Sequence, residues 1–226
     1  MAKKPTGTIG INRVDIHLDG DAIHTFVKLD FPPEKDAIEM LIAQDFVTSM
    51  NAKVAPTGML WFMSEPTQNT ENDFDFTITL PNGNTAWLEL IEIAPLELFG
   101  GFDHVPADFK PYDLAKIITA KIMKKAVHYS GKLGKELYLP TYITHWGFIP
   151  STSLINLVCY FLIQENHPFD GVYLYAPFQP GAGEGNVLAP IDPKFLAGFN
   201  PEQFKDNRVY NMDPTKVTLI KGQPSE

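Results

Sequence analysis

Apolar and polar residues alternate in two segments of the chain, which is the pattern of half-buried β-strands. The first segment, 14–31, is divided by Asp19-Gly20, and the second, 72–94, is divided by Asn82-Gly83. Both dipeptides favour the tight turn that joins the strands of a hairpin. The sequence therefore predicts one β-hairpin near the N-terminus and another in the middle of the chain.

Three other segments place apolar residues at helical spacing. The first opens with a proline and has two acids in its first turn, where they favour a helix start. The second carries lysines on its polar side and meets Gly131 as a stop. The third follows a serine-rich cap and is apolar nearly all round, as in a buried helix. The predicted helices are 33–52, 112–131 and 151–166.

Short apolar runs between turn-forming residues predict further strands at 58–65, 136–144 and 170–178. The segment 66–72 has the composition of a loop, and so has most of 179–226, with a last short strand at 216–220. The glycine-rich stretch 180–185 lacks the ending of a phosphate-binding P-loop, and we interpret it as a flexible loop.

The chain has 226 residues, of which 44% are hydrophobic, and this predicts a single globular domain. No apolar run is long enough to span a membrane, and the N-terminus lacks the apolar stretch of a signal peptide. Cys159 is the single cysteine, which excludes an internal disulfide and suits a buried thiol. We therefore expect a cytoplasmic protein without a membrane partner.

The net charge of −9 disfavours a polyanionic partner on average, but the charge is unevenly distributed. Between positions 110 and 135 the chain has seven lysines and one aspartate. A basic segment of this kind suits contact with phosphates, and it equally suits a solvated helix face.

The central hairpin carries acids on both strands. If Asn82-Gly83 forms a two-residue turn, Asp73 lies opposite Glu92, and Asp75 shares their face while Glu89 points to the other. Opposed carboxylates repel, and a divalent cation or a raised pKa relieves the repulsion. Asp75 and Glu92 are then candidate Mg²⁺ ligands. A one-residue bulge would exchange Glu92 for Glu89, and the alternative is that all four acids face solvent.

From position 33 the predicted elements follow the order helix, three strands, helix, strand, helix, strand. This order resembles the core of the PD-(D/E)XK nuclease superfamily, whose fold is called restriction-endonuclease-like. The resemblance implies an α/β fold with a mixed central β-sheet flanked by helices and an αβββαβ core at 33–178. An N-terminal hairpin extension, 1–32, and a mostly loop C-terminal extension, 179–226, would complete one domain.

The resemblance also implies a site. Asp75 matches the acid that enters the second core strand, with Asp73 as the alternative, and Glu92 or Glu89 matches the acid of the third. Glu39 resembles a glutamate that the family often carries on its first helix. The family's lysine two residues after the second acid is replaced by Ala94 or Ile91. A lysine on the following helix is the substitute, and we assign Lys121 to catalysis and Lys116, Lys124 and Lys125 to nucleic-acid phosphates.

These assignments predict a metal-dependent nuclease-like protein that hydrolyses phosphodiester bonds, with Mg²⁺ or Mn²⁺ held by Asp75 and Glu92. The expected partner is nucleic acid, and a homo-oligomer is a further option. The alternative is a catalytically inactive protein of the same fold that binds other proteins or itself. The missing strand lysine and the acidic net charge favour this alternative, whereas the acids of the hairpin and the lysine-rich helix favour the enzyme.

Overall fold

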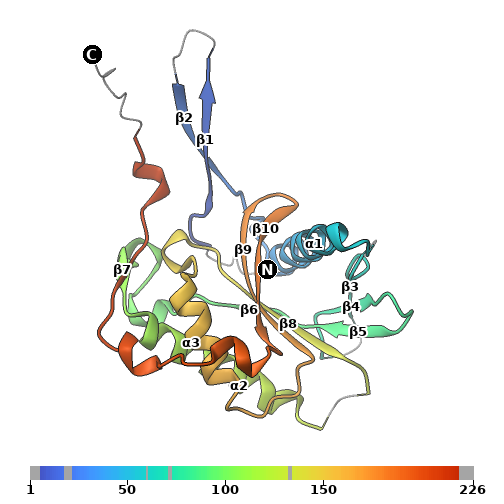
Figure 1. Cartoon of the computed structure of the whole chain (residues 1–226). Helices are drawn as coiled ribbons and strands as arrows, with labels where there is room; N and C mark the ends of the chain where they lie inside the picture. The colour runs from blue at the N-terminus through green and yellow to red at the C-terminus, as the bar shows by residue number, and fades with distance from the viewer. Residues whose placement is uncertain (1–5, 18–21, 60, 71–72, 132–133, 219–226) are drawn as a thin grey trace.

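A mixed β-sheet runs through the centre of the protein, with helices on both of its faces (Figure 1). The computed structural model describes residues 6–17, 22–59, 61–70, 73–131 and 134–218. The strands lie in the order β10-β9-β8-β5-β4-β3, and β6 also pairs with β8. Strands β5, β6 and β9 run parallel to β8, and the other neighbours are antiparallel. The bounds are β3 Thr67–Gln68, β4 Phe76–Thr79, β5 Thr85–Leu88, β6 Ile91–Glu92, β8 Leu137–Tyr142, β9 Gly171–Gln179 and β10 Ala182–Ala189.

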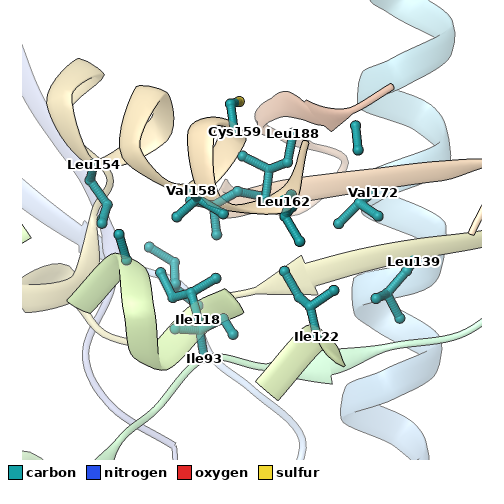
Figure 2. Packing of buried hydrophobic residues seen from close by; sticks show 14 of the residues in the cluster. Ile93, Ile118, Ile122, Leu139, Leu154, Val158, Cys159, Leu162, Val172 and Leu188 are labelled. Carbon is teal, nitrogen blue, oxygen red and sulfur yellow. The ribbon is translucent and has the colours of Figure 1, made fainter. Parts of the chain in front are cut away.

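The helices form two layers around this sheet. They are α1 Lys35–Val54, α2 Pro111–Tyr129 and α3 Thr152–Leu162. Because strand residues alternate between faces, β8 and β9 send their tyrosines to one side and their aliphatic residues to the other. The tyrosines pack with α1, whereas residues such as Leu139 and Val172 pack with α2 and α3. Figure 2 shows this second layer, in which Ile118 and Ile122 of α2 approach Val158 and Leu162 of α3.

Two small sheets lie outside the central one. The N-terminal strands β1 Gly10–Ile16 and β2 Ala22–Lys28 form a ribbon that stands away from the body of the protein (Figure 1). Strand β7, Asp108–Phe109, pairs with β11, Val209–Tyr210. Short 3₁₀ turns make up much of the remaining backbone after β10.

The structure confirms the predicted α/β class, the central mixed sheet and the three predicted helices within a few residues of their expected bounds. Ser151 caps α3 as expected, because its hydroxyl accepts a hydrogen bond from the Leu154 N–H at 3.3 Å. Cys159 is buried. None of the helices in the described ranges is long and apolar enough to cross a membrane.

The predicted strand at 58–65 is wrong, because its described residues form no strand and the first strand after α1 is Thr67–Gln68. The Asn51 side chain explains the irregular backbone. Its Oδ1 accepts hydrogen bonds from the N–H groups of Phe62 and Met63, and its Nδ2 donates to the Met63 carbonyl. These bonds replace the ladder that a strand would need. The predicted turn at Asp19-Gly20 lies outside the described residues.

The prediction of loop after residue 179 is wrong for 182–189, which form β10 beside β9. The sequence pattern did not predict this strand because its glycines interrupt the alternation of apolar and polar residues that is typical of strands. Packing requires them, since a Cβ at Gly183 would lie 2.4 Å from the Tyr175 hydroxyl oxygen and one at Gly185 would lie 3.0 Å from the Met50 sulfur. The strand predicted at 216–220 is a 3₁₀ turn at Lys216, and residues 219 and 220 are not described.

Phe46 is the central contact between α1 and the sheet, and its loss should destabilise the whole domain. The side chain is 0% exposed, and its ring meets those of Tyr173 and Tyr175 at centroid distances of 5.2 Å and 5.6 Å. We expect Phe46→Ala to lower the free energy of unfolding by about 3–5 kcal/mol, measured by urea denaturation. Phe195→Ala is the matched control, because Phe195 is 71% exposed. Equal losses in the two variants would contradict this packing.

Candidate active site

The central hairpin turns through three residues, 81–83, and not through the two that the sequence favoured. The Leu80 N–H donates to the Asn84 carbonyl at 2.9 Å, and Gly83 takes a φ of 83°, in the left-handed region that glycine tolerates. A type I turn followed by such a glycine is the usual three-residue hairpin. The third residue shifts the pairing of β4 and β5 by one position relative to the prediction.

Asp75 and Glu89 therefore face each other at the end of the hairpin. The ladder ends with Phe76 opposite Leu88, which places the next residues, Asp75 and Glu89, opposite one another. The expected position of Asp75 opposite Leu90 is wrong, and Glu89 points to the same face as Asp75. The Asp75 N–H donates to Glu89 Oε2 at 3.2 Å, and the Leu90 N–H donates to Asp75 Oδ2 at 2.8 Å. Each carboxylate thus binds the backbone of the opposite strand.

Lys125 brings a cation to this pair from α2. Its Nζ donates a hydrogen bond to Glu89 Oε1 and forms an ion pair with it. The Glu89 side chain is 1% exposed and that of Lys125 is 32% exposed, so the contact is largely shielded from water. Both carboxylate oxygens of Glu89 therefore have hydrogen-bond donors within the protein.

Burial and, after it, the adjacent Asp75 carboxylate raise the pKa of Glu89, and Lys125 lowers it, with a net pKa of about 6. Desolvation and a like charge both disfavour the ionised form. Burial and the same acids also raise the pKa of the Tyr129 hydroxyl well above its usual range, so it stays protonated as a donor. The pair therefore costs free energy when it is ionised, and a cation relieves that cost.

An aromatic column holds the strand that carries Asp75. Phe74 stacks on Trp87 at a centroid distance of 4.8 Å and on Tyr129 of α2 at 4.8 Å. The Tyr129 hydroxyl donates to the Asp73 carbonyl at 2.9 Å. Lys135 closes the column, with its Nζ 4.3 Å from the centre of the Trp87 ring. Stacking and the hydrogen bond together fix the entry of the chain into β4, and so fix Asp75 against α2.

A groove of about 560 Å³ opens beside these acids and runs from α1 to α2. The groove lies beside β6, past the end of β5. Among the described strands, β6 pairs only with β8, so no further strand covers this position. Lysines line both ends. The residues that line it are Lys35, Glu39, Leu90, Ile91, Glu92, Lys121, Lys124, Lys125 and His128.

Glu39 and Glu92 lie in this groove on the α1 side. Lys35 Nζ forms an ion pair with Glu39 Oε1 at 3.4 Å, and Glu39 raises the pKa of Lys35. Glu92 Oε1 accepts a hydrogen bond from the buried Thr144 hydroxyl at 2.6 Å. Burial raises the pKa of the Tyr142 hydroxyl beyond its usual range, and Glu92, Glu39 and Asp75 add to the shift. The charges of the three acids thus act on one buried hydroxyl.

The structure brings Glu39, Glu92 and three of the predicted lysines to this groove. Asp73, Asp75 and Lys116 are not among the residues that line it. Lys121, Lys124 and Lys125 line it together. Lys116 is exposed and lies over the ring of Tyr112, with its Nζ 4.7 Å from the ring centre, and it does not line the groove. The predicted pairing of Asp73 with Glu92 is wrong, because the same one-residue shift separates them.

The donor atoms at Asp75 and Glu89 suit a hard divalent cation. Within the described ranges, no group of three or more His, Cys, Asp and Glu side chains is arranged to hold a metal ion. Mg²⁺ is commonly bound by one or two carboxylates, with water and substrate phosphate oxygens completing its shell. Asp75 and Glu89 supply two carboxylates opposite each other at the end of the hairpin, so the residues present fit Mg²⁺ or Mn²⁺.

Comparisons of the chain with protein-family models, curated proteins and solved structures found no match. Function is therefore inferred from the geometry of the groove and its acids.

The sequence contained signals for the contacts that the prediction placed elsewhere. Gly83 stands third in the turn, which is where a three-residue hairpin needs its left-handed residue. Lys121, Lys124, Lys125 and His128 follow the i, i+3, i+4, i+7 spacing of one helix face, and Lys116 falls outside it. The aromatic column had no such signal, because its rings come from three separate segments.

Glu89 should make the stability of the protein depend on pH. Its folded pKa of about 6 lies above its ordinary value of 4.5, so the folded state favours the protonated carboxyl. The resulting stabilisation is complete below about pH 4.5 and is lost as the pH rises through about 6. The glutamine of Glu89→Gln cannot ionise, so the variant does not lose stability in this way as the pH rises. As the pH rises from about 4.5 to about 7, the free energy of unfolding of the wild type should fall by about 2 kcal/mol relative to the variant.

The measurement is urea denaturation of both proteins across this pH range in the presence of EDTA, which keeps divalent cations from masking the effect. Curves of unfolding free energy against pH that stay parallel would show that burial and Asp75 do not perturb Glu89.

Proposed function

We propose that the protein is a metal-dependent nuclease that hydrolyses phosphodiester bonds at Asp75, Glu89 and Lys125. The observation that carries the proposal is the meeting of two opposed carboxylates from neighbouring strands with a lysine from the next helix. A structural ion pair needs one acid and one base, whereas here a second acid lies against the buried one. A bound cation would relieve the repulsion between the two acids.

The order of the elements supports a restriction-endonuclease-like core. α1 is followed by β3, β4 and the interrupted strand β5–β6, and, after the short strand β7 of a separate sheet, by α2 and β8. The strands β3, β4, β5 and β8 are neighbours in the sheet in that order, and β8 is parallel to β5. Asp75 stands at the start of the second of these strands and Glu89 at the interruption of the third, where the resemblance places its acids.

Lys125 takes the role of the lysine that the third strand lacks. Ile91 stands two residues after Glu89, and the ammonium group reaches Glu89 from α2 instead. From there it orients the attacking water or stabilises the negative charge that develops on the phosphorane oxygens. Lys121, Lys124 and Lys35 line the same groove and bind neighbouring phosphates of the substrate strand.

Asp75 and Glu89 would hold the divalent ion, with Glu39 and Glu92 lining the groove beside them. When bound, the ion polarises the phosphodiester and lowers the pKa of a bound water. The aromatic column keeps Asp75 beside Glu89 while the substrate binds, because Phe74 stacks on both Trp87 and Tyr129.

One observation favours a second function, a catalytically inactive protein that keeps this fold for binding. Both Glu89 oxygens already accept hydrogen bonds from the protein, one from the Asp75 N–H and one from Lys125. A closed pair of this kind also suits a structural role, and the net charge of −9 does not attract nucleic acid.

Removing any of the three central groups should abolish cleavage. We expect Asp75→Asn, Glu89→Gln and Lys125→Met each to lower the cleavage rate by about 100-fold or more, because each removes charge at the reacting phosphate. The measurement is degradation of plasmid, single-stranded DNA and RNA with Mg²⁺ or Mn²⁺. Lys194→Met is the control, an exposed lysine outside the groove.

Cleavage that survives Asp75→Asn at the wild-type rate would identify a contaminant or a different site. Failure of the wild type to cleave any of these substrates with either metal would favour the inactive fold.

Substrate binding should separate the lysines of the groove from Lys116. We expect Lys121→Ala and Lys124→Ala each to weaken binding of a fluorescent oligonucleotide and to reduce the slope of log Kd against log salt by about one unit. Lys116→Ala should leave both quantities unchanged, because Lys116 packs on Tyr112 away from the groove. Fluorescence anisotropy over a salt series measures them, and an effect limited to Lys116 would restore the assignment made from the sequence.

A further inference from the structure

The ribbon of β1 and β2 leaves the body of the protein and exposes its outer half (Figure 1). At its base Ile9 and Leu29 are 0% and 2% exposed, and the Leu29 N–H donates to the Ile9 carbonyl at 2.9 Å. Towards the tip Val14 and Ile16 are 46% and 78% exposed. The described residues add no third strand to this sheet. The outer half thus has no described strand paired with either edge and has exposed side chains on both faces, while the 3₁₀ turn Pro214–Lys216 contacts β1.

Apolar side chains occupy both of these faces. The register places Val14 and Ile16 on one face and Ile23 and Val27 on the other. Ile23 is 54% exposed and Val27 is 40% exposed. A two-stranded hairpin is marginally stable in water without further packing, and exposed apolar ribbons of this kind mark association surfaces.

The charges on β1 select a second copy of the same chain as the partner. Arg13 and Asp15 flank Val14 and are 67% and 59% exposed. If β1 pairs antiparallel with β1 of a second copy about a two-fold axis at Val14, residue 13 of each chain lies opposite residue 15 of the other. Arg13 then meets Asp15 twice, and opposite charges placed directly across a sheet stabilise the pairing.

The open edge also lacks the usual protection against such pairing. Edge strands that stay single often carry a proline or like charges that repel a second copy. Neither β1 nor β2 contains a proline, and the two charges in the outer half of β1 are complementary under two-fold symmetry. Pairing about Val14 also sets this side chain beside its own counterpart, with Ile16 of each chain on the same face.

We propose that the protein forms a two-fold dimer in which the β1 strands of two copies pair antiparallel about Val14 into a continuous four-stranded sheet. The dimer is independent of the nuclease activity proposed above, since the ribbon contributes no residue to the groove that Lys125 lines.

Charge reversal tests the register. Arg13→Asp places two acids opposite each other at both ends of the pairing, and Asp15→Arg places two bases there. The double variant with both changes restores opposite charges. In sedimentation equilibrium of the full chain, we expect the wild type at twice the 25.3 kDa of one chain. Each single variant should dissociate with a Kd raised about ten-fold or more, and the double variant should return to the wild-type Kd.

Thermal melting and far-UV circular dichroism check that each variant is folded. If a charge variant loses its melting transition, Ile16→Ser replaces it, because that side chain lies outside the core and its loss should also weaken the dimer. The series covers a concentration range of about 100-fold. A wild type that still sediments as a single chain at the highest concentration would overturn the proposal. So would a dimer that both single reversals leave intact, a double variant that stays monomeric, or association only with added nucleic acid or another protein.

Discussion

The arrangement of the candidate site depends on the repulsion between two carboxylates that the sheet forces to face each other. Asp75 and Glu89 are opposite because the hairpin turns through three residues, and neither can move away without giving up a bond to the backbone of the other strand. Glu89 is almost fully buried, so solvent does not screen the repulsion. The protein relieves it with Lys125 from α2. This three-way contact ties the hairpin to the helix and sets where the groove opens.

The packing of the helices on the sheet positions the contact between Asp75, Glu89 and Lys125. Tyrosines of β8 and β9 pack under α1, and aliphatic residues on the other face pack under α2 and α3, so both helices that reach the groove rest on the same rigid sheet. The ladder to β8 is interrupted between β5 and β6, and side chains from α1 and α2 line the groove beside this interruption. The aromatic column through Phe74 then fixes the strand that enters beside them. Side chains carried by helices and strands are held more precisely than side chains on loops.

Local patterns in the sequence were sufficient to predict the helices, most of the sheet and several of the residues that line the groove. Periodicity locates α2, and the alternation of 73–80 locates β4, because those signals depend on near neighbours in the chain. The choice of Glu92 over Glu89 depended on one residue of turn length, and a register shift of one exchanges the faces of a strand. Strand β10 was missed because of its glycines. Their positions are explained by close packing against Tyr175 and Met50, and Met50 lies far away in the sequence. The contact of Lys125 with Glu89 likewise depends on how α2 docks, which no local pattern encodes.

Asp75 and Glu89 lie on the two strands of a hairpin near the edge of the sheet. Among the described strands, only the two-residue strand β3 lies beyond β4. Edge segments of this kind open more often than the strands at the centre of a sheet, and such openings need not involve the rest of the domain. The lifetime of the assembled groove is then set by fraying of this edge and not by the cooperative melting of the protein. Hydrogen exchange at the amides of 75 and 90 would report that fraying directly, while a melting curve dominated by α1, α2 and β8 would record none of it.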